Sequence, residues 1–254
     1  MSQVKSKILG LLIFLIIISV IFFIALMPSQ NHGAKNILSI NLSGNQLLPQ
    51  NSYLSYAKLN DIKNTNWITL PILKDRIEKH PFVASAEIEV SIARDAKVYV
   101  HEKNLAAILL FDDQTFILSD QLQLLPLLSN TKFMDLPIIN NPQFARMYKV
   151  LDYLNNEEII EAHHILYALK TKNEDMFKNL SEINLNNGKG ITLIFSGIRP
   201  IIKFGRGNFS RKILSLNSIW DEIKNVDNNL SQSDYVDLRF PNQIYLGKAE
   251  ETVL

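Results

Sequence analysis

The chain has 254 residues, no cysteine and a formal charge of +1 at neutral pH. The lack of cysteine excludes a fold held by disulfides, and the nearly neutral net charge argues against binding to nucleic acid, which needs a basic face. Hydrophobic residues make up 47% of the chain, which is enough to build a folded core in one or two domains.

An uncharged stretch near the N-terminus, Ile8–Met27, reads ILGLLIFLIIISVIFFIALM. A helix over these residues rises about 30 Å, the hydrocarbon thickness of a bilayer. The stretch therefore predicts a transmembrane helix over residues 8–27. A cleaved signal peptide is the alternative, but the stretch is longer than the usual apolar core of such peptides. Ala25-Leu26-Met27 also lacks the small-x-small cleavage pattern.

The lysines around this stretch predict its orientation. Lys5 and Lys7 precede it, and no further cation occurs until Lys35. The positive-inside rule then predicts a cytoplasmic tail over residues 1–7 and an extracytoplasmic part over residues 28–254. The polar residues 28–36 are expected to be a linker. Because the charge of +1 includes Lys5 and Lys7, the extracytoplasmic part carries about −1.

Residues 37–104 show a strand, two helices and two strands in succession. The helices follow from apolar residues at helical spacing, and the strands from alternating apolar residues. A proline in the first turn suits the second helix, and the dipeptide His80-Pro81 ends it, since the residue before proline avoids the α region. The predicted elements are Ile37–Leu42, Tyr53–Lys63, Leu70–Lys79, Val83–Ser91 and Ala96–Glu102.

Residues 105–248 predict a second, mixed α/β domain with a mainly antiparallel sheet, which makes the fold class α+β. The turn signal Asn187-Gly188 indicates a tight hairpin, and the hydroxyl of Ser210 is placed to cap a helix running to about Val226. The predicted strands are Ala106–Phe111, Thr115–Ser119, Pro137–Ile139, Leu180–Asn186, Gly190–Phe195 and Ile198–Phe204, and the other predicted helices are Phe144–Leu154 and Glu157–Lys170.

The last stretch, SDYVDLRFPNQIYLGK over Ser233–Lys248, predicts a strand, a turn and a final strand. A strand that arrives last often lies at a sheet edge, with only the tail of residues 249–254 after it. Alternation predicts that Val236, Leu238 and Phe240 face the core. It also predicts that Tyr235, Asp237 and Arg239 face the other way, where an ion pair would contribute little.

The candidate catalytic groups have simpler structural explanations. His163 and His164 lie next to each other on a predicted helix and so point about 100° apart, which is unsuited to one metal. Asp112-Asp113 fits a hairpin turn, and Glu157-Glu158 fits a helix N-terminus. The segment Gly205–Lys212, GRGNFSRK, lacks the spacing of a phosphate-binding loop. We therefore expect no catalytic residue, no metal and no cofactor.

Four segments in order resemble the FtsQ/DivIB family of bacterial division proteins. INLSGNQLLPQ resembles the opening strand and turn of its POTRA domain. The segment from Ile68 to Leu109 resembles the rest of that domain, with Phe82 in place of the usual tryptophan and Glu102 at the matching glutamate. Ile191–Leu216 resembles a strand, hairpin end and helix, and YVDLRF over Tyr235–Phe240 resembles a terminal signature.

The resemblance implies a cytoplasmic tail, one membrane helix, a POTRA domain over residues 37–104 and a C-terminal β domain over residues 105–248. It implies a non-enzymatic scaffold of the inner membrane at the division septum, with a periplasmic C-terminal domain. By the same resemblance, a FtsB/FtsL pair would dock on the C-terminal edge, and other division proteins on the POTRA domain. The expected contact residues are Tyr235, Asp237, Arg239, Phe240, Ile244, Tyr245 and Leu246.

Two questions stay open at this point. Asp237 and Arg239 could be structural or could touch the partner. A POTRA-bearing component of envelope assembly or transport, which would bind extended polypeptides, is the alternative function.

Overall fold

The computed structural model describes residues 13–22, 37–61, 68–132, 135–225 and 232–248. Residues 13–22 form a helix whose side chains are exposed. The expected cytoplasmic tail, linker, C-terminal tail and the two ends of the apolar stretch lie outside the described residues. Within these ranges no helix has both the length and the hydropathy needed to cross a membrane.

The first folded unit has the expected order β-α-α-β-β. It contains a three-stranded sheet in the order β1-β3-β2, with β1 parallel to β3 and β2 antiparallel to it. Alternation places Ala96, Val98 and Val100 of β3 in the core, and α3 buries Leu73 and Ile77 on one stripe. The elements are β1 (Ser39–Ser43), α2 (Gln50–Tyr56), α3 (Leu70–Glu78), β2 (Val83–Val90) and β3 (Asp95–Glu102).

The first helix is shorter than expected. It was predicted over Tyr53–Lys63, but α2 begins at Gln50 and ends at Tyr56. Lys58 adopts a left-handed conformation with φ of 57°, which interrupts the helix.

The second unit is built on a nine-stranded sheet in the order β12-β11-β10-β9-β8-β7-β4-β5-β6. Most neighbouring strands are antiparallel, so the prediction of a mixed, mainly antiparallel sheet in an α+β fold is confirmed. The first strands and the short 3-10 helix η2 are β4 (Leu105–Phe111), β5 (Gln114–Ser119), β6 (Leu124–Pro126), β7 (Ile138–Asn140) and η2 (Ala145–Met147).

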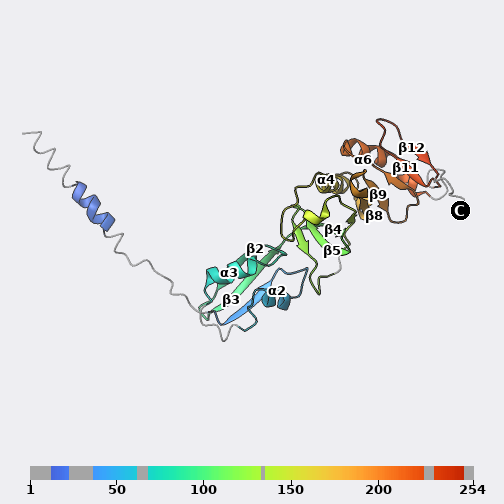
Figure 1. The fold of residues 1–254 in the computed structure, drawn as a ribbon. Helices are drawn as coiled ribbons and strands as arrows, with labels where there is room; N and C mark the ends of the chain where they lie inside the picture. Colours follow the sequence, from blue (N-terminus) through green and yellow to red (C-terminus); the bar gives the residue numbers. More distant parts are fainter. Residues whose placement is uncertain (1–12, 23–36, 62–67, 133–134, 226–231, 249–254) are drawn as a thin grey trace, which may run out of the picture.

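The remaining elements complete the sheet and place helices beside it. Figure 1 shows α4 and α6 lying along the second unit, with β11 and β12 at the end far from the first unit. The elements are α4 (Glu157–Lys172), α5 (Glu174–Asn179), β8 (Leu180–Asn184), η3 (Asn186–Gly188), β9 (Thr192–Phe195), β10 (Ile201–Lys203), α6 (Phe209–Ser218), α7 (Trp220–Lys224), β11 (Tyr235–Asp237) and β12 (Tyr245–Gly247).

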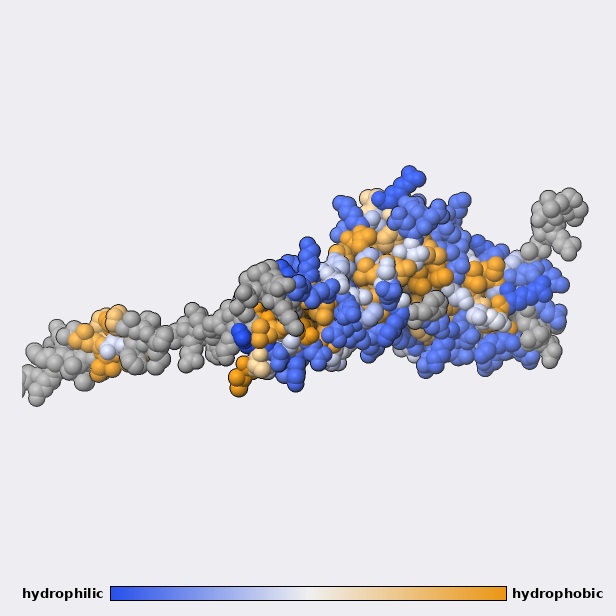
Figure 2. Space-filling model, turned by 90° about the horizontal axis from the view of Figure 1, so that it is seen from below, coloured by the Kyte–Doolittle hydropathy of each residue, from blue (hydrophilic) through white to orange (hydrophobic). Residues whose placement is uncertain are grey.

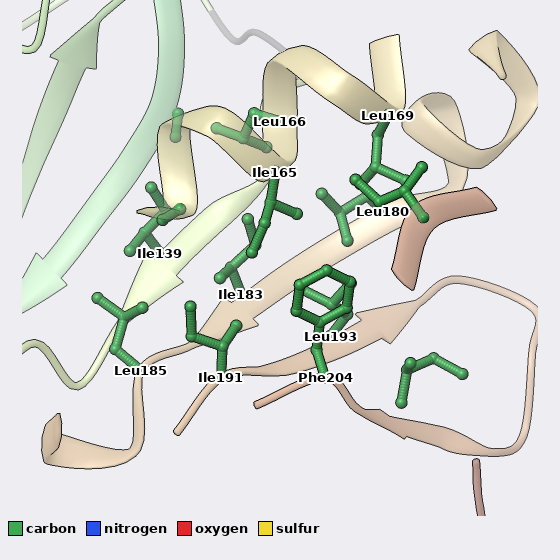
Figure 3. Close-up of a cluster of buried hydrophobic side chains, with 14 of the residues drawn as sticks. Ile139, Ile165, Leu166, Leu169, Leu180, Ile183, Leu185, Ile191, Leu193 and Phe204 are labelled. Carbon is green, nitrogen blue, oxygen red and sulfur yellow. The ribbon is translucent and has the colours of Figure 1, made fainter. Parts of the chain in front are cut away.

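The core of this unit lies between the sheet and its helices. Ile139, Ile183 and Leu193 are fully buried at the centre of neighbouring strands, and Ile165 and Leu169 of α4 pack over them (Figure 3). The same row continues along the sheet to Val236 of β11, because the register pairs these residues across each strand. Burial of Val236 in this row packs β11 onto the core although the strand is only three residues long.

The helix predicted over Phe144–Leu154 is wrong. Only the short η2 forms there, because Phe144 and Leu151 take left-handed conformations with φ of 60° and 74°. The backbone of this segment instead bonds to β6: the N–H of Leu151 donates to Leu124, and the N–H of Leu124 donates to Asp152.

Two turn predictions also need correction. The hairpin between β8 and β9 has a longer loop than the Asn187-Gly188 signal indicated, since η3 occupies it and the strands end at Asn184 and resume at Thr192. Ser210 is not a cap: α6 begins at Phe209, and Asn208 precedes it in a left-handed conformation.

The two units pack directly on each other. Ile117 of β5 and Leu125 of β6 are buried in the core of the first unit. Lys103, between the two sheets, donates from Nζ to the Pro81 carbonyl at 2.8 Å and to Gln123 Oε1 at 2.7 Å. These contacts join the first unit to the β5–β6 end of the nine-stranded sheet, which is the end opposite β12.

Candidate partner-binding edge

Strand β12 lies at one end of the nine-stranded sheet, as the sequence predicts for the last strand. It pairs antiparallel with β11, with Tyr245 opposite Asp237 and Leu246 opposite Val236. Within the described residues β12 has a strand neighbour on one side only. Successive residues of an edge strand alternately direct their backbone N–H and C=O groups outward, so β12 presents part of its backbone away from the sheet.

An ion pair fixes the turn between β11 and β12. The carboxylate of Asp237 accepts hydrogen bonds from three groups of Arg239. The backbone N–H of Arg239 donates at 3.0 Å, its Nε at 2.9 and 3.0 Å to the two oxygens, and its Nη2 at 2.5 Å. These bonds hold the pKa of Asp237 below its ordinary value, and the same bonds raise the pKa of Arg239. The side chain of Asp237 is 5% exposed and that of Arg239 is 54% exposed, so the carboxylate is buried while the arginine side chain remains accessible to solvent.

Burial of Asp237 corrects the expectation that it faces outward with Arg239 in a surface pair. Arg239 also covers the backbone beside it: a Cβ on Gly205 would lie 2.8 Å from Arg239 Cγ. Gly205 has φ of 68° and is buried, so a glycine allows the arginine stem to lie flat on this turn.

Three large apolar side chains are exposed around the edge. Phe240, Tyr245 and Leu246 are 50%, 47% and 45% exposed. The rings of Phe240 and Tyr245 meet edge to face with centroids 4.9 Å apart, and the Tyr245 hydroxyl donates to Gln243. The prediction that Phe240 faces the core is wrong, because β11 ends at Asp237 and its alternation does not continue to Phe240.

Two other residues that were expected to contact the partner, Tyr235 and Ile244, pack within the second unit. Tyr235 lies across Gly247 of β12, and the Lys203 ammonium sits 3.3 Å from its ring centroid. Ile244 packs against the core of the second unit. The structure therefore brings Phe240 and Tyr245 into contact at the surface and exposes Leu246 on the same strand, while Tyr235, Asp237, Arg239 and Ile244 make contacts within the unit.

A cationic cavity beside the edge was missed by the sequence reasoning. Its volume is about 60 Å³, and its basic lining comes from Arg206, Arg211, Lys212 and Arg239. Phe240 also lines this cavity. Burial lowers the pKa of Lys212, whose Nζ donates to the Arg206 carbonyl at 2.8 Å. The spacing of cations in GRGNFSRK was the available signal, although only the fold brings Arg239 to them.

The segment GRGNFSRK is also tied to α4. Arg206 forms ion pairs with Glu158 and Glu161, and Glu161 accepts from the Gly207 N–H at 3.0 Å. Glu158 is buried and accepts from the Gln143 N–H at 2.9 Å. Glu158 therefore has a structural role, because it binds Gln143 and Arg206 inside the unit, as expected for the Glu157-Glu158 pair.

The histidines and the remaining acidic pair occupy structural positions. His163 and His164 both lie on α4, and burial lowers the pKa of His163. Asp112 and Asp113 form the turn between β4 and β5, both with positive φ. Among the residues that the structure describes, no cluster of His, Asp and Glu is arranged to hold a metal ion.

Comparison with known proteins points in one direction. Residues 107–239, just over half of the chain, match the family model described as "Cell division protein FtsQ/DivIB, C-terminal". A curated relative, "Cell division protein FtsQ" of Geotalea daltonii, is 21% identical over 182 residues, which are 71% of this chain. The match spans 64% of that relative, less than two thirds of its length. The chain belongs to the FtsQ/DivIB family of cell division proteins.

Proposed function

We propose that this protein is a non-enzymatic scaffold of the division machinery that recruits a FtsB/FtsL pair by adding a partner strand to β12. One observation carries the proposal: β12 is an edge strand that exposes its own Tyr245 and Leu246, and the exposed Phe240 of the preceding turn contacts the Tyr245 ring. Sheet edges with this exposure are normally protected, and strand addition by a partner is one way to satisfy them.

The surroundings of β12 suit a preformed docking site. The Asp237–Arg239 pair and the stacking of Tyr235 on Gly247 hold β12 in register before any partner arrives. A site that is ordered in advance loses less conformational entropy on binding. The apolar side chains supply pockets for alternate residues of an added strand. Among the cations that line the adjacent cavity, Arg206 and Arg239 are already paired with Glu158, Glu161 and Asp237, so the cavity adds little charge preference to the docking site.

The location of the protein is part of the proposal. Residues 8–27 would anchor it in the inner membrane as a single-pass type II protein, with residues 1–7 cytoplasmic and residues 28–254 periplasmic at the septum. The β-α-α-β-β unit over residues 37–104 would be a POTRA domain that contacts other division proteins. The C-terminal domain over residues 105–248 would then connect them to the FtsB/FtsL pair.

The test is a binding measurement on the full chain in lipid nanodiscs with the extracytoplasmic segments of FtsB and FtsL from the same organism. Leu246→Lys places a charge on the edge, and Leu214→Lys is its control because Leu214 is 53% exposed on α6. We expect Leu246→Lys to weaken binding by about tenfold or more, whereas the control should bind like the wild type.

A proline variant tests the backbone itself. Tyr245→Pro removes a donor and resists strand pairing, so it should also weaken binding, provided that circular dichroism shows a folded variant. Equal binding by wild type, Leu246→Lys and Tyr245→Pro would move the contact away from β12. A wild-type protein that binds extended polypeptides but not the FtsB/FtsL segments would instead support envelope assembly.

A further inference from the structure

The tip of the hairpin between β2 and β3 carries an unusually exposed apolar side chain. Ile92 is 94% exposed, more than any other large hydrophobic residue in the described ranges. The turn is closed by backbone bonds of 3.0 Å from Ser91 to Asp95 and from Arg94 to Ser91. These bonds hold Ile92 at the apex of the hairpin, so its exposure is a property of the folded turn.

One exposed isoleucine is not by itself informative, since folded proteins expose many apolar atoms. Its place in the fold gives it meaning. The N–H of Leu38 donates to the Arg94 carbonyl at 2.9 Å, so the chain enters the first unit beside this tip. Leu38 is 42% exposed and Val90 at the end of β2 is 37% exposed. Figure 2 shows hydrophobic surface at this end of the molecule.

The entry point lies close to the proposed anchor along the chain. The segment from Met27 to Leu38 can span at most about 40 Å even when fully extended. The end of the first unit that carries Ile92 is therefore the end held nearest to a bilayer. Strand β12 lies at the opposite end of the molecule (Figure 1).

We propose that the β2–β3 tip is a membrane-contact site that inserts Ile92 into the bilayer interface, with Leu38 and Val90 beside it. This inference rests on the proposed anchoring by residues 8–27. Apolar side chains enter the headgroup–acyl boundary to a depth of about 5–10 Å, which an apical isoleucine can reach. The contact gives the ectodomain a fixed tilt and holds β12 away from the membrane, where a partner can reach it.

The charges around the tip indicate which lipids it needs. Arg94 and Lys97 are cationic, but Glu89 lies opposite Lys97 across the hairpin and Asp95 follows Arg94. All four side chains are exposed. Because the positive and negative charges balance, insertion should depend on the apolar side chain and proceed in bilayers of neutral lipid.

The experiment exploits the absence of native cysteine. The full chain carrying Ile92→Cys is labelled with an environment-sensitive fluorophore and reconstituted in phosphatidylcholine nanodiscs with or without brominated acyl chains. Asp113→Cys, at the turn between β4 and β5, is the matched exposed control. Ser19→Cys within the apolar stretch reports anchoring. Bromolipid should quench the label at Ile92→Cys about threefold more than at Asp113→Cys.

A second variant removes the concern that the fluorophore itself drives insertion. Here the label is placed at Leu38→Cys, and Ile92 is either kept or changed to aspartate. Quenching at Leu38→Cys should fall when Ile92→Asp is added. Quenching at Ser19→Cys without any at Ile92→Cys, or equal quenching at Leu38→Cys with and without Ile92→Asp, overturns the tip contact and leaves anchoring intact. An unquenched Ser19→Cys overturns the anchor and the tip contact together.

Discussion

The Asp237–Arg239 pair allows a quantitative test of how the partner-binding edge is held. Asp237 is buried and accepts four hydrogen bonds from Arg239, three of them from the guanidinium. Asp237→Asn keeps one acceptor but removes the negative charge and leaves the guanidinium poorly paired. Charge-assisted hydrogen bonds contribute about 1.5–3 kcal/mol each when buried. Because Arg239 is half-exposed, we discount this to a total of about 2 kcal/mol for the variant.

The assay is urea unfolding of the full chain in detergent in a Trp67→Phe background, so that the fluorescence reports Trp220, which is buried beside the sheet. The control is Arg199→Gln, because Arg199 makes an ion pair of 2.9 Å with Asp234 while its side chain is 67% exposed. The control should lose less than about 0.5 kcal/mol of free energy of unfolding. Equal losses for Asp237→Asn and Arg199→Gln would refute the idea that the buried pair organises the turn.

The same pair has a defined pH dependence. The folded state lowers the pKa of Asp237, so the unfolded state takes up a proton first as the pH falls. The stabilisation is therefore complete above the ordinary carboxyl pKa of about 3.9 and is lost as the pH falls through the lower folded value. Wild type should lose more stability than Asp237→Asn below about pH 4.

Three further predictions concern other buried contacts. Burial lowers the pKa of His80 to about 4, so the free energy of unfolding should fall by up to about 3 kcal/mol between pH 6.5 and pH 4. The fall should be smaller in His80→Gln, and urea unfolding at a series of pH values measures it. Equal pH dependence of the two proteins would contradict the prediction. Glu158→Gln should cost about 2 kcal/mol in urea unfolding, because Arg206 loses its buried partner, and an unchanged midpoint would contradict this. Gly247→Ala should displace the Tyr235 ring and destabilise by about 1–3 kcal/mol in thermal unfolding, whereas the double variant with Tyr235→Ala should recover part of the loss.

The sequence predicted best where apolar spacing and local stop signals agree. The order of elements in the first unit followed from alternation in β3 and the stripe of α3, and the end of that helix before His80-Pro81 was correct. The last two strands and their edge position were also predicted, because a terminal strand–turn–strand pattern adds to a sheet from one side.

The failures occurred where tertiary contacts override local propensity. Apolar residues in Phe144–Leu154 have a helix-like composition, but their backbone bonds to β6 and leaves Phe144 exposed. Alternation through Tyr235–Phe240 assumed a strand that continues, whereas Arg239 turns back to bind Asp237. The contact between Arg239 and Asp237 determines which residues of the candidate site are exposed. Hydrophobic periodicity in the sequence does not predict this contact.

The cationic cavity illustrates a different limit. Arg206, Arg211 and Lys212 are close in the sequence, but Arg239 joins them only because β10 and β11 are parallel neighbours. Clusters built across a sheet depend on strand order, which local patterns do not specify.

The most direct test of strand addition is backbone hydrogen exchange on the full chain in nanodiscs, with and without the FtsB/FtsL segments. Peptides covering Tyr245–Gly247 report β12, and peptides covering β10 serve as the internal control because β10 already has strand neighbours on both sides. We predict that the outward amides of β12 exchange at least about tenfold more slowly in the complex, while β10 is unchanged. A complex that forms without added protection in β12 would contradict the proposed mechanism.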